Sequence, residues 1–216
     1  MKIILLGPPG AGKGTQAKTL ASKLNVAHIA TGDLLRQNVA KDTDLGKQAK
    51  DFMNKGALVP DELVTQMISL RMQEADIEKG FILDGYPRNI NQAESLDKIL
   101  KDRGSEIDSV IYLDASEPVI IQRLTGRLVC SQCGANFHIK NMPPKVAMVC
   151  DNCQAKLFQR TDDRAETIKK RLEVYLQESH PLIEYYKKKG KLKRVSSDED
   201  AGIVLDKMLK LLNREQ

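Results

Sequence analysis

Short apolar runs alternate with longer amphipathic stretches along most of this chain. The runs are rich in Val, Ile and Leu, and they predict strands at Lys2–Leu6, His28–Ala30, Phe81–Asp84, Ser109–Asp114 and Lys193–Val195. Helical periodicity predicts helices over residues 13–24, 33–41, 45–54, 61–74, 91–101, 118–127, 164–188 and 200–213. The alternation predicts an α/β fold of three layers, α/β/α, with helices covering both faces of a five-stranded parallel sheet.

Two of these helices carry local expectations of their own. The long helix over 164–188 is expected to be capped by Asp163, because Glu166 follows three residues later as in a capping box. In the helix over 118–127, Arg123 and Arg127 are four residues apart, so we expect them to share one helix face.

Two segments interrupt the alternation of strand and helix. Residues 30–59 hold two short helices without an intervening strand, and residues 126–163 contain the cysteines, Pro143, Pro144 and several turn residues but no long apolar helix. Both are predicted to be mobile subdomains inserted at the carboxyl edge of the sheet, where open α/β proteins bind ligands. The remaining residues, 1–29, 60–125 and 164–216, are expected to form the core.

Composition narrows the possible functions. The chain has 216 residues, of which 41% are hydrophobic and only 4% aromatic, with no Trp, so it is poorly supplied with side chains that stack on bases. The net charge of +5, from 34 basic and 29 acidic residues, suits small anionic ligands. We find neither a secretory signal nor an apolar run of membrane-spanning length, and therefore expect a soluble, cytoplasmic protein without a membrane partner.

Gly7-Pro8-Pro9-Gly10-Ala11-Gly12-Lys13 fits the G-x-x-x-x-G-K part of the P-loop pattern and lies between a predicted strand and a predicted helix. Inward-facing backbone N–H groups, the helix N-terminus and the lysine charge together favour a nucleotide triphosphate. Gly14 stands where many P-loops have Ser or Thr, and the hydroxyl comes one position later at Thr15. The sequence therefore leaves direct or water-mediated Mg²⁺ coordination open, with Asp84, at the end of an apolar strand, as the carboxylate that would orient the waters.

Four cysteines form two C-x-x-C pairs, Cys130 with Cys133 and Cys150 with Cys153. Sixteen residues separate the pairs, a spacing typical of a tetrahedral zinc site. Four protein ligands leave no open coordination position, so we interpret the metal as structural: a segment of this size cannot bury enough apolar surface to hold its own shape. An iron centre of the rubredoxin type and free thiols are the alternatives.

Several further motifs make the sequence specific. Gly7–Thr15, Ala30–Arg36, Asp84–Arg88 with Asn89 and Gln92, Gln122–Arg127, Arg160–Asp163 and Lys169–Leu172 occur in the order found in adenylate kinase of the long, bacterial type, which the whole chain resembles. The resemblance implies Mg²⁺-dependent transfer of the terminal phosphoryl group of ATP to AMP, giving two ADP. It also implies that 30–59 is the AMP-binding subdomain, that 126–163 is a zinc-binding lid, and that the protein is a monomer.

The resemblance further implies roles for individual residues. The catalytic set comprises Lys13, Asp84, Arg88, Arg127, Arg160 and Arg171. The ATP-binding set comprises Gly10, Ala11, Gly12, Lys13, Gly14, Thr15, Arg123 and Arg127. The AMP-binding set comprises Thr31, Arg36, Ala57, Leu58, Val59, Gly85, Tyr86, Pro87, Arg88, Gln92, Arg160 and Arg171, with Gln92 on the adenine and Arg36 and Arg88 on the phosphate.

The residues taken alone predict compatible chemistry. Phosphoryl transfer depends mainly on positioning and on charge stabilisation, for which arginine is well suited, and an ionised phosphate acceptor needs no general base. The three histidines, His28, His138 and His180, are accordingly interpreted as structural. Asp162 and Asp163 either hold a closed lid or cap the following helix. The alternatives to an AMP kinase are a UMP or CMP kinase and, in a different class, a nucleotide-switched nucleic-acid binder that uses the cysteine pairs as a ribbon.

Overall fold

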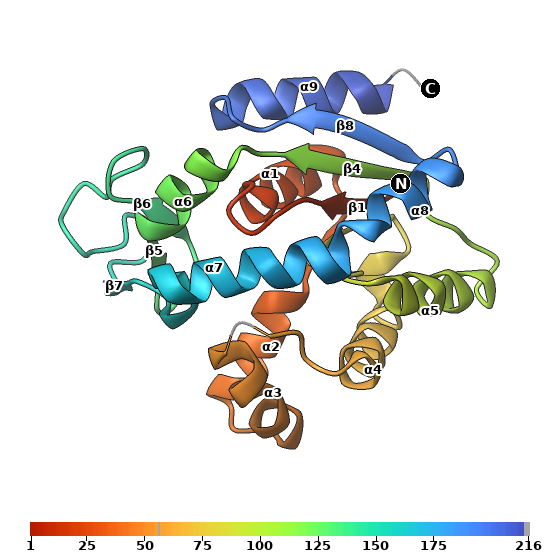
Figure 1. The fold of residues 1–216 in the computed structure, drawn as a ribbon, viewed down its shortest axis with the longest axis horizontal. Helices are drawn as coiled ribbons and strands as arrows, with labels where there is room; N and C mark the ends of the chain where they lie inside the picture. Colours follow the sequence, from red (N-terminus) through yellow and green to blue (C-terminus); the bar gives the residue numbers. More distant parts are fainter. Residues whose placement is uncertain (56, 214–216) are drawn as a thin grey trace.

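The computed structural model describes residues 1–55 and 57–213. Its centre is a five-stranded parallel sheet in the order β2-β3-β1-β4-β8 (Figure 1). The strands are β1 (Lys2–Leu6), β2 (Ala27–Ala30), β3 (Phe81–Asp84), β4 (Ser109–Asp114) and β8 (Leu192–Ser196). The α/β class, the five strands and their approximate bounds are therefore confirmed.

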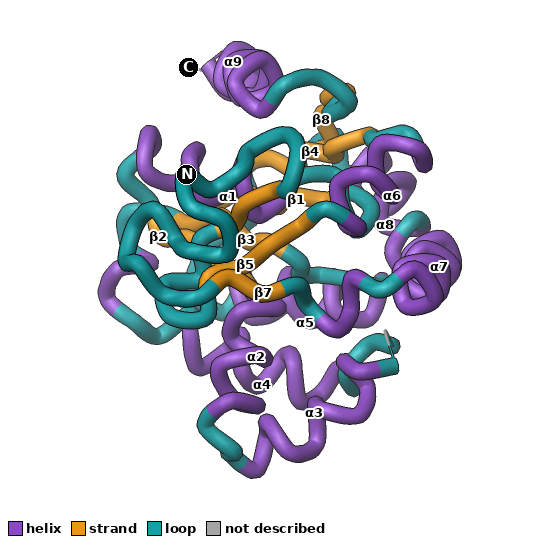
Figure 2. Tube along the Cα trace, turned by 90° about the vertical axis from the view of Figure 1, so that its left-hand side faces the viewer, coloured by secondary structure: helices purple, strands orange, loops and turns teal. Residues whose placement is uncertain are grey.

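Helices cover both faces of the sheet. On one face, β1, β3 and β4 pack against α4 (Asp61–Arg71), α5 (Ile90–Lys101) and α8 (Pro181–Lys188). On the other, the same strands and β8 pack against α1 (Lys13–Leu24) and α9 (Ala201–Asn213). Figure 2 shows the sheet between these layers. Alternate residues of each strand face opposite layers, so parallel strands covered on both sides are apolar throughout, as the sequence pattern indicated.

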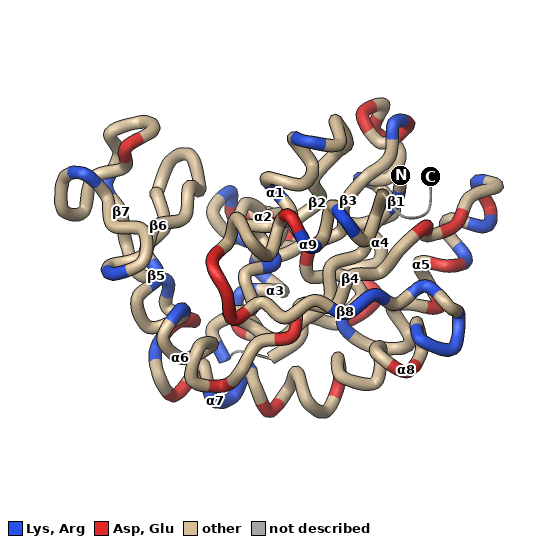
Figure 3. Tube along the Cα trace, turned by 90° about the horizontal axis from the view of Figure 1, so that it is seen from above, with Lys and Arg blue, Asp and Glu red and all other residues tan. Residues whose placement is uncertain are grey.

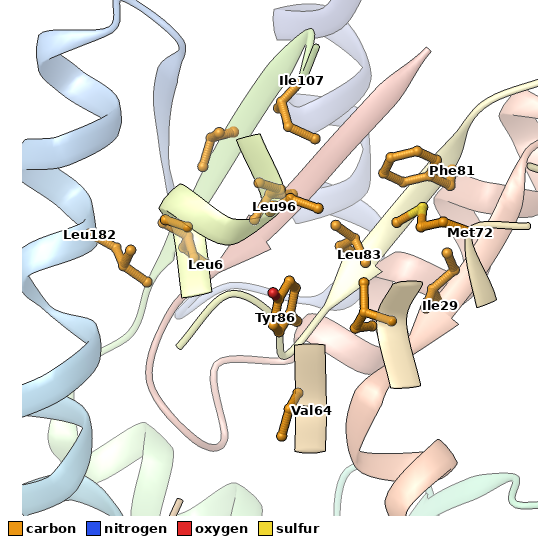
Figure 4. Packing of buried hydrophobic residues seen from close by; sticks show 14 of the residues in the cluster. Leu6, Ile29, Val64, Met72, Phe81, Leu83, Tyr86, Leu96, Ile107 and Leu182 are labelled. Atoms are coloured by element: carbon orange, nitrogen blue, oxygen red, sulfur yellow. The ribbon is translucent and has the colours of Figure 1, made fainter. Parts of the chain in front are cut away.

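Tyr86 lies within the first of these cores. Figure 4 shows its ring between Leu83, Leu96 and Val64, side chains that come from β3, α5 and α4. The tyrosine is fully buried. Its hydroxyl lies 3.2 Å from Thr65 Oγ1 and donates to the Gln92 carbonyl at 3.2 Å. The core therefore anchors the segment that follows β3.

Residues 30–59 form an αα unit, as predicted. It consists of α2 (Thr31–Ala40) and α3 (Asp44–Asn54), which pack against each other below the sheet in Figure 1. The Gly46 amide donates to Thr43 Oγ1 at 3.0 Å, so Thr43 caps α3. The first helix begins at Thr31, two residues before the predicted start.

Residues 126–163 contain a three-stranded antiparallel sheet that the sequence did not predict. Its order is β6-β5-β7, and the strands are β5 (Arg127–Cys130), β6 (Asn136–His138) and β7 (Leu157–Phe158). Strands of two to four residues are too short to show a period. The preceding helix, α6 (Glu117–Thr125), ends before Arg127, so the expectation that Arg123 and Arg127 share a helix face is wrong.

The predicted long helix over 164–188 is divided. It comprises α7 (Ala165–Val174), a π-helical segment (Tyr175–Ser179) and α8, which begins at Pro181. Pro181 has no N–H to continue an α-helical ladder, and the His180 amide instead donates to the Tyr175 carbonyl five residues back. The predicted Asp163 cap is also wrong: the N-cap is Arg164, which makes no capping bond with its side chain. Two 3₁₀ turns, η1 (Ala75–Ile77) and η2 (Thr161–Asp163), complete the description.

Basic and acidic residues are interspersed along the chain instead of being separated into two halves (Figure 3). None of the helices in the described part of the chain has both the length and the apolar character that a membrane crossing requires.

Candidate nucleotide-binding cleft

A cleft of about 1010 Å³ opens at the carboxyl ends of the central strands. Its floor is the loop between β1 and α1 together with Asp84 and Arg88, and its walls come from residues 30–59 and 126–163. It also includes Val174, Tyr175 and Ser179 from the α7–π segment. The sheet brings the two inserted segments, about seventy residues apart in the chain, to one opening, as the placement of ligands in open α/β sheets predicts.

The β1–α1 loop has the geometry of a phosphate cradle. Gly7 has φ 144°, and a Cβ there would lie 2.5 Å from the Leu113 carbonyl oxygen, so no other residue fits. Gly12 is the N-cap of α1 in the left-handed conformation, with no side chain covering the unpaired N–H groups of the first turn. The loop therefore directs backbone donors and a helix N-terminus into the cleft.

Lys13 supplies a charge beside these donors. Its Nζ donates to the carbonyls of Gly7 at 2.6 Å and Pro8 at 2.9 Å. Burial lowers the pKa of Lys13 to about 8; the nearby Asp84 acts in the opposite direction, and Arg88 adds to the lowering. A bound phosphate would relieve this unfavourable environment.

Asp84 ends β3 beside the cradle. A Cβ added to Gly14 would lie 3.2 Å from Asp84 Oδ2, so the position where many P-loops carry a hydroxyl is adjacent to this carboxylate. His28 Nε2 lies 3.7 Å from the same Oδ2 and has no hydrogen-bond partner among the described residues. His28 therefore lines the cleft, a location that its place beside a strand did not reveal.

Asp163 joins two arginines of the predicted catalytic set. Its buried carboxylate accepts from Arg127 Nε at 2.7 Å and Nη2 at 2.5 Å, and from Arg171 Nη1 at 3.1 Å. Arg171 also donates to the Asp162 carbonyl at 2.9 Å and pairs with its carboxylate at 3.1 Å. Neither aspartate is the N-cap of α7, so the capping role is wrong, and the role of holding a closed lid stays a prediction.

A second carboxylate bridges the two walls of the cleft. Asp33, on α2, accepts a hydrogen bond from Arg36 Nη2 and lies 3.6 Å from Arg160 Nη2 on the opposite wall. Burial opposes ionisation, but the Arg36 and Arg160 guanidinium groups hold the pKa of Asp33 below its usual range. The pKa of Arg160 falls to about 10 because of burial and the like charges of Arg36 and Arg127. Such mutual repulsion favours an anion between them.

Arg88 is held close to the same cations. Its Nε donates to the Gly85 carbonyl at 2.9 Å, and its backbone N–H donates to Gln92 Oε1 at 2.8 Å. Burial, Arg171 and Arg36 together lower its pKa to about 10. Its terminal Nη atoms have no protein partner within residues 1–55 and 57–213 and are available to a ligand.

Some residues of the predicted AMP-binding set are not on the cleft surface. Thr31, Tyr86 and Gln92 are almost completely buried and do not line the cleft, whereas Arg36, Gly85, Pro87 and Ala57–Val59 do. The Gln92 amide is bonded inward, with Oε1 accepting from Arg88 and Nε2 donating to Asp61 Oδ1 at 2.7 Å. The sequence analysis did not identify Asp61, because an aspartate in the first turn of a helix is usually explained by its favourable interaction with the helix dipole.

The predicted ATP-binding residues lie together. Gly10, Ala11, Gly12, Gly14 and Thr15 line the cleft around Lys13. Arg123 lines it from α6, and its Nη2 donates to the Glu199 carbonyl at 3.1 Å. Burial lowers the pKa of Arg123, although Asp198 and Asp200 lie close enough to oppose the shift.

All four cysteine sulfurs meet in the segment 126–163. Their Sγ atoms lie within 4.8 Å of one another, and the closest pairs are Cys130–Cys153 at 3.4 Å and Cys133–Cys150 at 3.6 Å. A regular tetrahedron with metal–sulfur bonds of about 2.3 Å places its sulfurs about 3.8 Å apart, so the group fits a four-coordinate metal ion and the distances exclude disulfides. Amide N–H groups of Gln132 and Cys133 point at Cys130 Sγ, as expected for a metal-bound thiolate.

The parallel sheet, the β1–α1 cradle and its lysine define a P-loop nucleotide-binding protein. A sequence profile of the adenylate kinase family matches residues 5–191. The chain is 50% identical over 212 residues to an adenylate kinase of Thermoanaerobacter sp. (strain X514), covering 98% of both chains. It is 49% identical over 215 residues to an adenylate kinase of Caldicellulosiruptor saccharolyticus, with complete coverage of both, and 50% identical over 200 residues to one of Methanocella arvoryzae, covering 93% of each.

The chain therefore belongs to the adenylate kinase family, the nucleoside monophosphate kinases that transfer the terminal phosphoryl group of ATP to AMP. Members of this family use Mg²⁺ with ATP. The fold class and the enzyme class expected from the motifs are confirmed.

Proposed function

We propose that phosphoryl transfer between ATP and AMP takes place in the cleft described above, between the Lys13 cradle and a ring of four arginines, Arg88, Arg127, Arg160 and Arg171. The observation that carries this proposal is their convergence: Lys13 and these arginines come from five separate stretches of sequence and line one cleft. Residues Gly10–Thr15 would bind the ATP phosphates, and Arg123 would lie against the ATP adenine.

The charges explain how this arrangement accelerates transfer. The migrating group passes through a loose state with negative charge on its equatorial oxygens, and guanidinium groups already fixed in a shielded cleft stabilise that charge without reorganisation. The acceptor phosphate of AMP is ionised, so no side chain has to remove a proton. Asp163 orients Arg127 and Arg171 from behind and would be retained through the reaction.

On the acceptor side, Arg36 and Arg88 would bind the AMP phosphate, with Ala57–Val59 and the Gly85–Pro87 backbone along the nucleoside. Gln92 Oε1 and Nε2 each keep one unused hydrogen-bonding position, so the amide can contact the adenine edge once the segment 30–59 exposes it. Thr31 and Tyr86 would support this wall from within, since Thr31 Oγ1 donates to the carbonyls of Asp84 and Gly85.

Mg²⁺ bound with ATP would neutralise part of the phosphate charge. Asp84, beside Gly14 and facing the cradle, fits the role of orienting its water ligands, and water-mediated coordination suits the absence of a hydroxyl at position 14. In the cysteine cluster, four thiolates at tetrahedral spacing favour Zn²⁺, with a structural role.

The inserted segments 30–59 and 126–163 would act as an AMP-binding subdomain and a lid that close over the core formed by 1–29, 60–125 and 164–216. Closure excludes water, and a water molecule would otherwise accept the phosphoryl group. We further propose a monomeric, cytoplasmic enzyme whose partners are ATP, AMP and ADP and which binds no nucleic acid, since only 4% of its residues are aromatic and none is Trp.

A coupled assay tests the proposal directly. ADP formation from ATP should be fast with AMP as acceptor and at least a hundredfold slower, in kcat/KM, with UMP, CMP or GMP. A comparable rate with UMP or CMP would instead assign a pyrimidine monophosphate kinase. A bisubstrate mimic of two adenosines joined by five phosphates should bind the wild type tightly and lose affinity in Lys13→Met and Arg88→Ala; unchanged affinity in both variants would place the reaction elsewhere.

A further inference from the structure

Ser179 makes a contact that none of the roles above uses. Its Oγ donates to the Arg88 carbonyl at 2.7 Å, although the two residues are 91 positions apart in the chain. Ser179 is half-buried and lies on the wall of the cleft. The bond joins the C-terminal end of the π-helical segment to the loop between β3 and α5.

The Arg88 carbonyl depends on this partner. Asn89 is the N-cap of α5, so Arg88 lies outside the helix and its carbonyl receives no bond from the helical ladder. Among the described residues, Ser179 is the only hydrogen-bond donor to that oxygen. The backbone N–H of Arg88 donates to Gln92 Oε1, and the side-chain Nε of Arg88 donates to the Gly85 carbonyl. The peptide after Arg88 is thus fixed by Ser179, while the two Nη atoms have no hydrogen-bond partner in the described part of the chain.

The π-helical segment explains why a serine of the α7–α8 stretch reaches this loop. Each π turn contains more than four residues, so the segment rotates the following side chains relative to the face that an uninterrupted α-helix would present. The His180 N–H bonds to the Tyr175 carbonyl, and Pro181 then starts α8 in a new register. This local departure, of a kind often found at functional sites, directs Ser179 toward Arg88.

We propose that Ser179 is a positioning residue for the phosphoryl-transfer reaction, acting by fixing the backbone of Arg88 so that its guanidinium faces the transferred group. The inference rests on the proposed role of Arg88. A neutral hydrogen bond contributes modestly to stability, but a displacement of about 1 Å at a reacting group can reduce the rate a hundredfold. The effect should therefore fall on turnover more than on folding.

A matched pair of variants isolates the hydroxyl. Ser179→Thr keeps the hydroxyl, and Ser179→Val has a methyl group in its place. Thr and Val side chains have nearly the same shape, and both are β-branched, so both lower the stability of the helix by a similar amount. We expect Ser179→Val and Ser179→Ala to lower kcat about tenfold and to raise the KM for AMP, whose phosphate Arg88 also contacts, with the KM for ATP within twofold. Ser179→Thr should stay within about threefold of the wild type. Equal activity of the Thr and Val variants at equal melting temperature would overturn the inference.

Coupling to Arg88 separates this inference from the proposal on which it rests. If Ser179 acts through the Arg88 side chain, Ser179→Val should cost about tenfold in the wild type and less than twofold in an Arg88→Ala background. The same tenfold loss in both backgrounds would show that Ser179 acts independently of Arg88 and would refute its positioning role. High activity of Arg88→Ala alone would instead refute the proposed role of Arg88.

Discussion

The phosphate cradle and the cysteine-bearing segment keep their shapes by different means. The cradle follows β1, whose residues Ile3–Leu5 are completely or almost completely buried between two layers of helices. The segment 126–163 has three short strands and a core of only six buried residues, of which two are metal-ligand candidates, Cys130 and Cys150. In one region the sheet supplies rigidity; in the other, the small apolar core leaves that role to the metal ion that we propose at the four cysteines.

This difference matches the roles that we propose for the two regions. The groups proposed to hold the donor phosphates follow a strand packed between the two main cores, where close packing resists small displacements. Arg127 and Arg160 lie near the two ends of the cysteine-bearing segment, which contacts the rest of the protein through ion pairs such as Arg160–Asp33 and Asp163–Arg171. If the segment 126–163 moves as we propose, Arg127 and Arg160 move toward the cleft and away from it, whereas the cradle stays in place.

The largest effect is expected from removing charge at the fixed side of the cleft. Arg88→Ala should reduce kcat at least a thousandfold, or roughly 4 kcal/mol, because its unpaired Nη atoms would lose their contact with the transferred group. The coupled assay measures the loss, and an unchanged circular dichroism melt shows that the fold is retained. The control is Arg103→Ala, an exposed arginine in the turn that follows α5. Activity of Arg88→Ala within tenfold of the wild type would remove it from the catalytic set.

Two glycine variants compare the regions directly. Gly7→Ala places a Cβ 2.5 Å from the Leu113 carbonyl oxygen at φ 144°, so it should lower the free energy of global unfolding by about 3 kcal/mol. Gly134→Ala, at φ 66° with nothing within 4 Å, should cost about 1 kcal/mol, confined to the cysteine-bearing segment. Urea unfolding and hydrogen exchange measure both values. Equal global losses would contradict the contrast between a sheet-supported and a metal-supported region.

Metal removal addresses the second region alone. Cys153→Ser should lower stability by roughly 2 kcal/mol, or several degrees in melting temperature, since one thiolate ligand of four is lost. Exchange should rise first within 126–163, and kcat at 25 °C should fall less than threefold. Ser131→Ala, between two of the cysteines, is the control. Zinc content near one per chain, measured by mass spectrometry, would support the metal, whereas a chelator without effect on melting would argue for free thiols.

The smallest effect concerns protons. Lys13 has a pKa of about 8 in the free protein because of burial, so at pH 8.5 most of its amine is neutral. A bound polyphosphate raises that pKa, so Lys13 should take up about half a proton or more on binding at pH 8.5 and almost none at pH 6.5. Affinity should fall as the pH rises above 8. Calorimetry in buffers of different ionisation enthalpy measures the uptake.

The matched variants for this measurement are Lys13→Arg and Lys18→Arg. An arginine at position 13 stays charged across this range, so proton uptake should disappear. Lys18 is exposed at the edge of the cleft, and its replacement should leave the uptake unchanged. Uptake that persists in Lys13→Arg would assign the proton to another group.

The sequence by itself determined the parts that depend on local chemistry. Apolar runs predicted the three most buried strands, β1, β3 and β4, and the glycine pattern with Lys13 placed the cradle between β1 and α1. The spacing of the cysteines predicted one cluster, and the six motifs predicted the family. Each of these patterns involves a few neighbouring residues or a fixed spacing, so it predicts structure without knowledge of which distant segments are in contact.

Only the tertiary structure decided which charges meet and how each is supported. Asp163 joins Arg127 across 36 positions, and Ser179 reaches Arg88 across 91. The strands of 126–163, the end of α6 before Arg127 and the division of the long helix at Tyr175–Ser179 were also missed. Short strands, helix ends and π turns differ from their alternatives by small local free energies, so packing between distant segments selects among them.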